Sequence, residues 1–183
     1  MLEVDFSPFP ILGTERLLLR RMVKTDLPEI LRLRGDDRVM QYIDRKKASS
    51  LEDAEEWFNI VEDAINNNNG ITWAITLKQD PSFMIGSIGL WRFIKEHFRA
   101  EVGYMLKTDF WRQGIMKEAL KKVIEYGFDE LRLHSIEGQI NSGNTASANI
   151  LLNSGFVQEA HFKENYFFQG VFKDTIVFSI LEK

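Results

Sequence analysis

The chain has 183 residues, 44% of them hydrophobic and 27% charged, and its 23 basic and 27 acidic side chains give a formal net charge of −4. A chain of this length forms one globular domain whose core needs no metal or disulfide to hold it together. The sequence contains no cysteine, which excludes disulfides, thiol nucleophiles and zinc sites built from thiolates. Its interspersed charges argue against nucleic-acid binding, which requires a clustered basic face.

The N-terminal segment lacks the features of an export signal. Glu3 and Asp5 stand where a signal peptide would carry basic residues, and Pro8 and Pro10 interrupt any apolar helix. No apolar run reaches the roughly 18 residues that a membrane span requires. We therefore expect a cytoplasmic protein that does not contact a membrane.

The prolines also favour extended backbone. Residues 1–13 are accordingly expected to form an extended arm that packs on the surface of a single domain, residues 14–183. Within that domain the sequence RLLLRR at residues 16–21 predicts the first strand, and the polar pair before Leu27-Pro28 predicts the start of a helix. A capping-box pattern at Ser49 and Ser50 predicts a second helix that ends after Ile65.

The middle of the chain changes from strands to a helix. Three strands with polar connections are predicted at residues 71–77, 83–94 and 100–106. From Gly114 the apolar residues recur at helical spacing and predict a central helix. The remaining elements are a strand, a helix and two strands, at residues 135–140, 144–154, 156–163 and 172–181.

This order predicts an α/β (α+β) domain with a mixed, mostly antiparallel sheet of seven strands, flanked by about four helices. The strands before and after the central helix should be parallel neighbours, joined by a right-handed crossover.

The common catalytic signatures are missing from the sequence. There is no G-x-G-x-x-G, no G-x-x-x-x-G-K-[ST] and no G-x-S-x-G motif, and the three histidines are far apart. We expect no metal site. The informative segment is YMLKTDFWRQGIMK at residues 104–117, where a strand passes through a short loop into the central helix. Free backbone N–H groups and the helix dipole favour anion binding at such a junction, and Gly114 would let a phosphate approach closely.

Four motifs occur in order along the chain: TERLLLR at residues 14–20, AEVGYML at 100–106, FWRQGIMKEAL at 110–120 and HSIEGQINSGNTASANILLNSGF at 134–156. Together they resemble the GNAT acetyltransferase superfamily, and specifically its RimJ/RimL-like ribosomal-protein N-acetyltransferase branch. The resemblance covers essentially the whole chain after the arm. It implies a GNAT-type domain that uses acetyl-CoA as co-substrate and no metal.

The resemblance also assigns residues. The pantetheine arm of acetyl-CoA is expected along the backbone of Met105, Leu106 and Lys107. Asn144 is expected to hold the splayed strand and the cofactor, and Ser147 to lie near the thioester sulfur. The pyrophosphate is expected on the loop and the first helical turn, which comprise Trp111, Arg112, Gln113, Gly114, Ile115, Met116 and Lys117.

Three positions depart from the family pattern. Arg112 and Met116 replace residues that are often smaller in this branch, and Leu151 replaces a tyrosine that many members carry. Ser147 is then the better candidate for the acid that assists the leaving thiolate.

Glu101 is the first candidate for the general base, with Glu164 and Tyr166 as alternatives. A peptide α-amine has a pKa of about 7.7 to 8.0, so a weak base suffices to deprotonate it. The backbone N–H of Met105 or Leu106 is expected to hold the carbonyl oxygen. Several aromatic residues are candidates for the lining of the acceptor cleft: Tyr42, Trp57, Trp73, Trp91, Tyr166, Phe167, Phe168 and Phe172.

The resemblance favours an N-acetyltransferase that acts on a protein N-terminal amine, of a ribosomal protein above all. Two alternatives stay open: a small amine such as a polyamine, an amino acid or an antibiotic as acceptor, and a non-catalytic acyl-CoA-binding module. Residues 35–50 and 164–170 are the loops expected to select the acceptor. The protein is expected to be a monomer or a homodimer.

Overall fold

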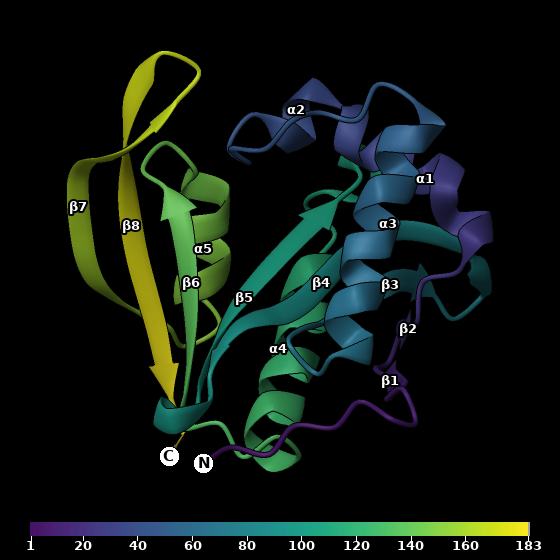
Figure 1. Ribbon diagram of the computed structural model, residues 1–183, viewed down its shortest axis with the longest axis horizontal. Helices are drawn as coiled ribbons and strands as arrows, with labels where there is room; N and C mark the ends of the chain where they lie inside the picture. The colour runs from purple at the N-terminus through teal and green to yellow at the C-terminus, as the bar shows by residue number, and fades with distance from the viewer. Residues whose placement is uncertain (183) are drawn as a thin grey trace.

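An eight-stranded sheet in the order β1-β2-β3-β4-β5-β6-β8-β7 forms the middle of the computed structural model, which describes residues 1–182 (Figure 1). Among the described strands, β5 and β6 are the only parallel neighbours. The strands are β1 (Leu12–Gly13), β2 (Leu17–Arg20), β3 (Ile71–Leu77), β4 (Asp80–Ile94), β5 (Arg99–Leu106), β6 (Ser135–Asn141), β7 (Val157–Phe168) and β8 (Val171–Leu181).

Helices cover both faces of the sheet. The helices α1 and α3 lie on one face, and α4 and α5 lie on the other (Figure 1). Three single turns of 3-10 helix, η1, η2 and η3, occur at Lys24–Asp26, Lys95–His97 and Thr108–Phe110. The α-helices are α1 (Leu27–Gly35), α2 (Asp37–Met40), α3 (Leu51–Asn66), α4 (Ile115–Asp129) and α5 (Thr145–Leu152).

The two long helices form where the apolar spacing predicts them. The Ser50 side chain caps α3 by accepting a hydrogen bond from the Asp53 N–H. The apolar stripe of α3 is buried, and so is that of α4, whose Gly127 is packed so closely that a Cβ would lie 2.8 Å from Ile136 Cδ1. Removing these stripes from water is the main term that holds both helices on the sheet.

The predicted fold class is confirmed, as is the parallel pairing of the strands before and after the central helix. The sheet has one strand more than predicted, because β1 at the end of the arm pairs with β2. The short helix α2 is a further addition. Both elements have four residues or fewer, too few for hydrophobic periodicity to reveal.

The N-terminal arm packs against the domain through every second side chain. Leu2, Val4 and Phe6 are buried in the core. They alternate with polar residues, which is the spacing at which extended backbone turns every second side chain to the same side. The arm also covers Trp73, whose Nε1 donates to the Pro10 carbonyl at 2.7 Å. Trp73 is therefore a core residue and does not line an acceptor cleft.

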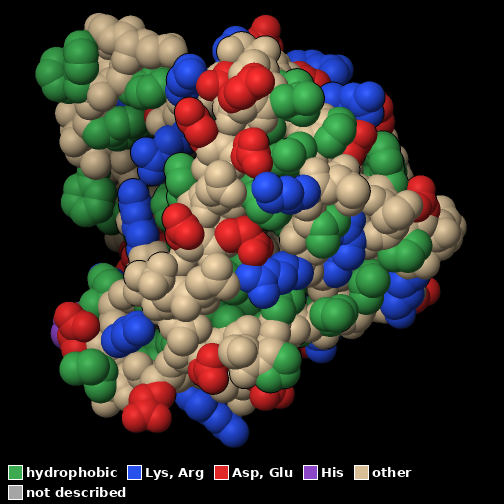
Figure 2. Space-filling view, turned by 45° about the vertical axis from the view of Figure 1, so that its right-hand side comes forward, with side chains coloured by type: hydrophobic (Ala, Val, Ile, Leu, Met, Phe, Trp, Pro, Cys, Tyr) green, Lys and Arg blue, Asp and Glu red, His purple; other side chains and the backbone are tan. Residues whose placement is uncertain are grey.

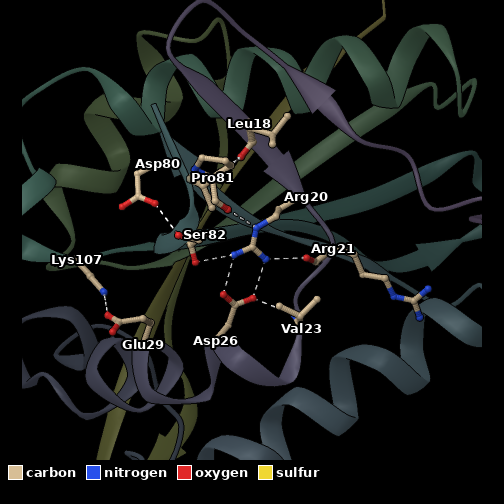
Figure 3. A network of polar contacts seen from close by, with 11 residues as sticks. Leu18, Arg20, Arg21, Val23, Asp26, Glu29, Asp80, Pro81, Ser82 and Lys107 are labelled. Carbon is tan, nitrogen blue, oxygen red and sulfur yellow. Dashed lines mark hydrogen bonds and ion pairs between the residues drawn. The ribbon is translucent and has the colours of Figure 1, made fainter. Parts of the chain in front are cut away.

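A buried ion pair joins β2 to the start of α1 (Figure 3). Asp26 is 1% exposed, and its two carboxylate oxygens accept from the Arg20 guanidinium at 2.7 and 2.8 Å. Arg20 Nε also donates to the carbonyl of Pro81 in β4. The start of α1 is thereby fixed to the sheet, and α1 carries Glu29, which pairs with Lys107 at the end of β5.

Removing the charge of Asp26 should destabilise the fold, because it leaves the Arg20 cation buried without its partner. We expect Asp26→Asn to lower the free energy of unfolding by about 3–5 kcal/mol, measured by urea denaturation. The exposed Lys24–Glu55 pair supplies the control, since Glu55→Gln should leave the midpoint nearly unchanged. Similar midpoints for both variants would contradict this role of Asp26.

Candidate active site

The parallel strands β5 and β6 separate soon after they meet. They pair through three residue pairs, the last of which is Glu101 with Glu137. On its other side β5 stays paired with β4 as far as Leu106. Within residues 1–182, the stretch from Val102 to Leu106 therefore has no ladder partner on the β6 side, and the two strands diverge visibly (Figure 1). Backbone groups on such an edge can bind an extended ligand as a further strand would.

The sequence predicts ligand contacts along this edge, and the structure adds local detail. The Leu106 carbonyl accepts a hydrogen bond from Trp111 Nε1 at 2.8 Å, which fixes the loop after β5 against the strand. The Lys107 side chain pairs with Glu29 and lies 4.1 Å from the centre of the Phe83 ring. The backbone N–H of Lys107 donates to the Ile85 carbonyl at 2.9 Å, and its carbonyl accepts from the Phe110 N–H at 3.0 Å. The backbone of Lys107 is therefore engaged within the fold, which leaves Met105 and Leu106 as the better placed of the three residues predicted to contact the pantetheine arm.

The loop after β5 leads into the N-terminus of α4. Gly114 is the N-cap residue and has φ +74°, a conformation that L side chains rarely adopt. No side chain of the described residues caps this end of α4, so the first-turn N–H groups stay available to an anion. Ile115 and Met116 are buried. The larger side chain at Met116 therefore points into the core and does not obstruct the outer face of the loop.

Arg16, which the sequence motifs did not single out, supports this loop from the bend just before β2. Its Nη1 donates to the Gln113 carbonyl at 2.9 Å, and its Nε pairs with Glu118 of α4 at 2.6 Å. Thr14 Oγ1 donates to the same carboxylate. The arginine thus places a half-exposed cation beside Gly114, where it would attract phosphate.

Ser147 and Tyr104 face each other across the widening gap. Asn144 caps α5, its Oδ1 accepting from the Ser147 N–H at 3.1 Å. Burial raises the pKa of Tyr104 to about 12, and hydrogen bonding from the neighbouring Ser147 side chain lowers it. The Tyr104 hydroxyl is buried, and in the described part of the chain its contact with Ser147 does not reach ordinary hydrogen-bond geometry. Tyr104 begins the informative segment of the sequence, but no role could be assigned to it there, because its neighbours depend on how β5 and α5 pack together.

Glu101 lies on the opposite face of β5, since side chains alternate along a strand and Glu101 and Tyr104 are three residues apart. It is 6% exposed. Its Oε2 accepts from Arg92 Nη1 at 2.9 Å. Burial raises the pKa of the Glu101 carboxyl, Arg92 opposes the rise, and Glu137 adds to it. A carboxyl with a raised pKa at the point where the strands part is suited to accept a proton.

Trp91 lies on the same face as Glu101. Its ring covers Gly103, so that a Cβ on Gly103 would lie 3.3 Å from Trp91 Nε1. The ring is partly exposed, and the Arg92 guanidinium stacks 4.6 Å from its centre. Trp91 is one of the aromatic residues predicted to line the acceptor cleft, and it is directly paired with Glu101 across β4 and β5.

The two alternative bases lie elsewhere. Glu164 is exposed in the hairpin of β7 and β8, and its backbone N–H donates to Asp174. The Tyr166 hydroxyl donates to Asp44, in the loop after α2, and burial together with Asp44 raises the pKa of Tyr166. Lys173 of β8 pairs with the same Asp44. Asp44 therefore connects the loop after α2 to β7 and β8, at the end of the sheet where β5 and β6 have diverged.

The arrangement fits a ligand that has an extended polar arm and an anionic group. The unpaired edge of β5 suits the arm, the N-terminus of α4 and Arg16 suit the anion, and the Tyr104 hydroxyl lacks a partner that such a ligand could supply. Residues 1–182 contain no group of three or more histidine, aspartate or glutamate side chains that could hold a metal ion. No helix in the described chain is long and apolar enough to cross a membrane. On the face in Figure 2, acidic and basic side chains are interspersed.

Comparisons with known proteins agree with this geometry. A family model described as an acetyltransferase (GNAT) domain matches residues 16–157. The chain is similar to the uncharacterized N-acetyltransferase YoaA of Bacillus subtilis, at 33% identity over 95% of this chain and 98% of YoaA. It is 24% identical to a spermidine N(1)-acetyltransferase of Vibrio cholerae, over 91% of this chain and 94% of that protein.

Among solved structures, RimL, a ribosomal alpha-N-protein acetyltransferase in complex with coenzyme A, superposes with a TM-score of 0.85. The match covers 94% of this chain and 98% of the RimL chain at 18% sequence identity. At this identity the likeness establishes the fold.

The environment of Glu101 leads to a prediction about stability. Because its folded-state pKa is raised, the folded protein binds a proton at Glu101 more tightly than the unfolded chain does, and ionisation destabilises the fold as pH rises through that range. Glu101→Gln should therefore raise the free energy of unfolding at pH 7 by about 1.4 kcal/mol for each unit of the pKa difference, seen as a higher urea midpoint. The gain should shrink toward pH 4. Arg92→Gln, which removes the opposing cation, should lower the midpoint at pH 7, and a stability loss in Glu101→Gln at pH 7 would contradict the argument.

Proposed function

Because the chain belongs to the GNAT acetyltransferase family, we propose that it transfers the acetyl group of acetyl-CoA directly to the N-terminal α-amine of a protein, with a ribosomal protein as the favoured acceptor. Family membership makes it an acetyl-CoA-dependent N-acetyltransferase. Family membership does not identify the acceptor, and the choice of a protein α-amine rests on the arrangement of charges around the gap.

One observation carries the choice of acceptor: three carboxylates around the gap, Glu101, Glu137 and Asp44, are each paired with a cation. Glu101 pairs with Arg92, Glu137 pairs with Arg99, and Asp44 pairs with Lys173. A polyamine needs several unpaired carboxylates, since each of its ammonium groups loses water on binding. A single α-amine needs none beyond the base. The balanced charge therefore favours an acceptor with one reacting amine.

The proposed roles follow from the two faces of β5. The first-turn N–H groups of α4, with Arg16 beside them, hold the diphosphate, and the edge of β5 holds the pantetheine arm. The backbone N–H of Met105 or Leu106 polarises the thioester carbonyl. Glu101 accepts the proton that the amine loses, and Ser147 donates a hydrogen bond to the departing thiolate.

An α-amine also matches the strength of the base. About a tenth of such amines are neutral at pH 7, whereas less than a hundredth of lysine-like amines are. A raised carboxyl pKa lies closer to that of an α-ammonium, so proton transfer to Glu101 is less unfavourable than transfer to an ordinary carboxylate. Glu101 is adequate for an α-amine and weak for a lysine or polyamine nitrogen.

A polyamine is the second candidate acceptor, because the Vibrio cholerae relative that is 24% identical over 91% of this chain is a spermidine N(1)-acetyltransferase. A panel of amines assayed by release of free thiol separates the candidates. The panel needs a peptide with a free N-terminus, the same peptide acetylated at its N-terminus but carrying a lysine, and spermidine. Turnover of the first peptide alone supports the proposal, and turnover of spermidine alone contradicts it. No turnover with any amine indicates the third reading, a non-catalytic acyl-CoA-binding module.

Binding of the co-substrate is tested most directly at Gly114. Coenzyme A should raise the melting temperature of the wild type, since a ligand at one hundred times its Kd stabilises the native state by about 2.7 kcal/mol. Gly114→Val should abolish this shift by blocking the approach of the diphosphate to the end of α4.

Gly170→Val is the matched control for this variant. Gly170 also has a positive φ, +83°, and lies in the turn between β7 and β8 with nothing within 4 Å of its would-be Cβ. The variant should suffer similar backbone strain and keep the full shift with coenzyme A. An equal loss of the shift in both variants would mean that the site at α4 has been placed wrongly.

The role of Glu101 is tested by the pH dependence of kcat/KM. With an α-amine acceptor, Glu101→Gln should lose a modest part of its rate at pH 7 and recover most of it near pH 8.5, where the amine deprotonates unaided. With a polyamine acceptor the same variant should stay impaired at about pH 8.5. Identical profiles for wild type and variant would remove Glu101 from the reaction.

A further inference from the structure

The Tyr104 hydroxyl is a buried polar group without a function in the fold. No hydrogen bond of ordinary geometry reaches it among residues 1–182, and the only side chain whose hydrogen bonding lowers its pKa is Ser147. Tyr166, in contrast, has both Asp44 and Asn141 within hydrogen-bond distance of its hydroxyl. A buried hydroxyl with no partner destabilises a protein, and native structures rarely keep one unless a ligand or water completes it. The fold alone would be better served by phenylalanine at this position.

The position of Tyr104 shows which ligand could complete it. The residue lies in the part of β5 that has no partner on the β6 side, three residues beyond the last pair and immediately before Met105. Tyr104 is paired with Ile88 of β4. Leu90, two residues from Ile88 and hence on the same face of β4, packs toward Gly127 of α4. Its side chain therefore lies on the face that α4 and α5 cover, and Ser147 is its neighbour there.

We propose that the Tyr104 hydroxyl donates a hydrogen bond to the sulfur of acetyl-CoA and, with Ser147, stabilises the thiolate as it leaves. In this step the amine nitrogen forms a bond to the acetyl carbon, the carbon–sulfur bond breaks, and its electron pair stays on sulfur. The proton lost by the amine goes to the base on the other face of β5. The inference rests on the acetyl-CoA chemistry of the proposed function and is independent of the acceptor.

Tyr104 acts by hydrogen bonding and not by giving up its proton. Its pKa of about 12 exceeds that of a thiol, about 8.5, so net transfer of the proton to the thiolate is unfavourable. A hydroxyl that stays protonated is a lasting donor to a developing negative charge, and its effect is largest where water is excluded. Burial thus suits Tyr104 to this role while making it a poor general acid.

The variant Tyr104→Phe removes only the hydroxyl and keeps the packed ring. The first measurement is the thiol pKa of bound coenzyme A, titrated by the ultraviolet absorbance of the thiolate. In the wild type this pKa should lie below that of free coenzyme A, and in Tyr104→Phe it should move back toward the free value. Tyr126→Phe is the matched control, because Tyr126 is also buried, with its pKa raised to about 12, but lies on α4 against Trp73.

The second measurement is turnover. Tyr104→Phe should lower kcat about ten- to hundredfold while the KM for acetyl-CoA stays within about twofold, as expected for a donor that acts on charge formed during the reaction. Adding Ser147→Ala should cost less than it does in the wild type, because both hydroxyls act on the same sulfur. Tyr104→Phe should be at least as stable as the wild type, since the hydroxyl has no partner to lose.

An unchanged thiol pKa and an unchanged kcat in a folded Tyr104→Phe variant would overturn the inference. If that variant does not fold, the test compares the affinity of the wild type for coenzyme A with its affinity for desulfo-coenzyme A, which has hydrogen in place of the thiol. A thiol has a pKa of about 8.5, so coenzyme A is mostly a thiolate above that pH. Tighter binding of coenzyme A than of the desulfo analogue in this range supports a hydrogen-bond donor at the sulfur. Equal affinity for the two overturns it. Neither result depends on which amine is the acceptor, so failure of the proposed acceptor would be seen separately in the amine panel.

Discussion

The divergence of β5 from β6 after three residue pairs is the constraint on which the rest of the structure depends. Parallel strands cannot be joined by a hairpin, so the chain must cross over between them, and here α4 makes that crossing. The crossing starts at the end of β5. The N-terminus of α4 and the unpaired edge of β5 are therefore neighbours by topology, and a ligand with an anionic end and an extended arm can use both.

The gap between the strands is closed at one end and bridged at the other. At the closed end the Phe98 carbonyl accepts from the N–H of His134, which leads into β6. At the open end Asp44 contacts Tyr166 and Lys173. These side-chain contacts connect the hairpin of β7 and β8 to the loop after α2.

Hydrophobic periodicity was sufficient to predict α3 and α4, because each buries a regular stripe. The strands β3 and β5 bury consecutive residues, and they were predicted from apolar runs between polar connections. The burial of Leu2, Val4 and Phe6 in the arm was not predicted, because their alternation spans only a few residues. Within the site, residues inside one motif, such as Gly114 and Ser147, could be named from the sequence. Arg16, Arg92 and Tyr104 could not, because their partners lie on other elements, and only the register of the strands brings them together.

Glu101 and Tyr104 occupy opposite faces of one strand, and this has a kinetic consequence. In the proposed assignment of roles, the two substrates reach the reacting atoms from different sides of the sheet, so neither blocks the entrance of the other. That assignment requires both to be bound before the acetyl group moves, which is a sequential mechanism with a ternary complex. A small inhibitor that fills one side leaves the other side free and is noncompetitive toward the substrate bound there. A bisubstrate inhibitor has to pass through the opening beside β5, and its linker can be no thicker than that opening.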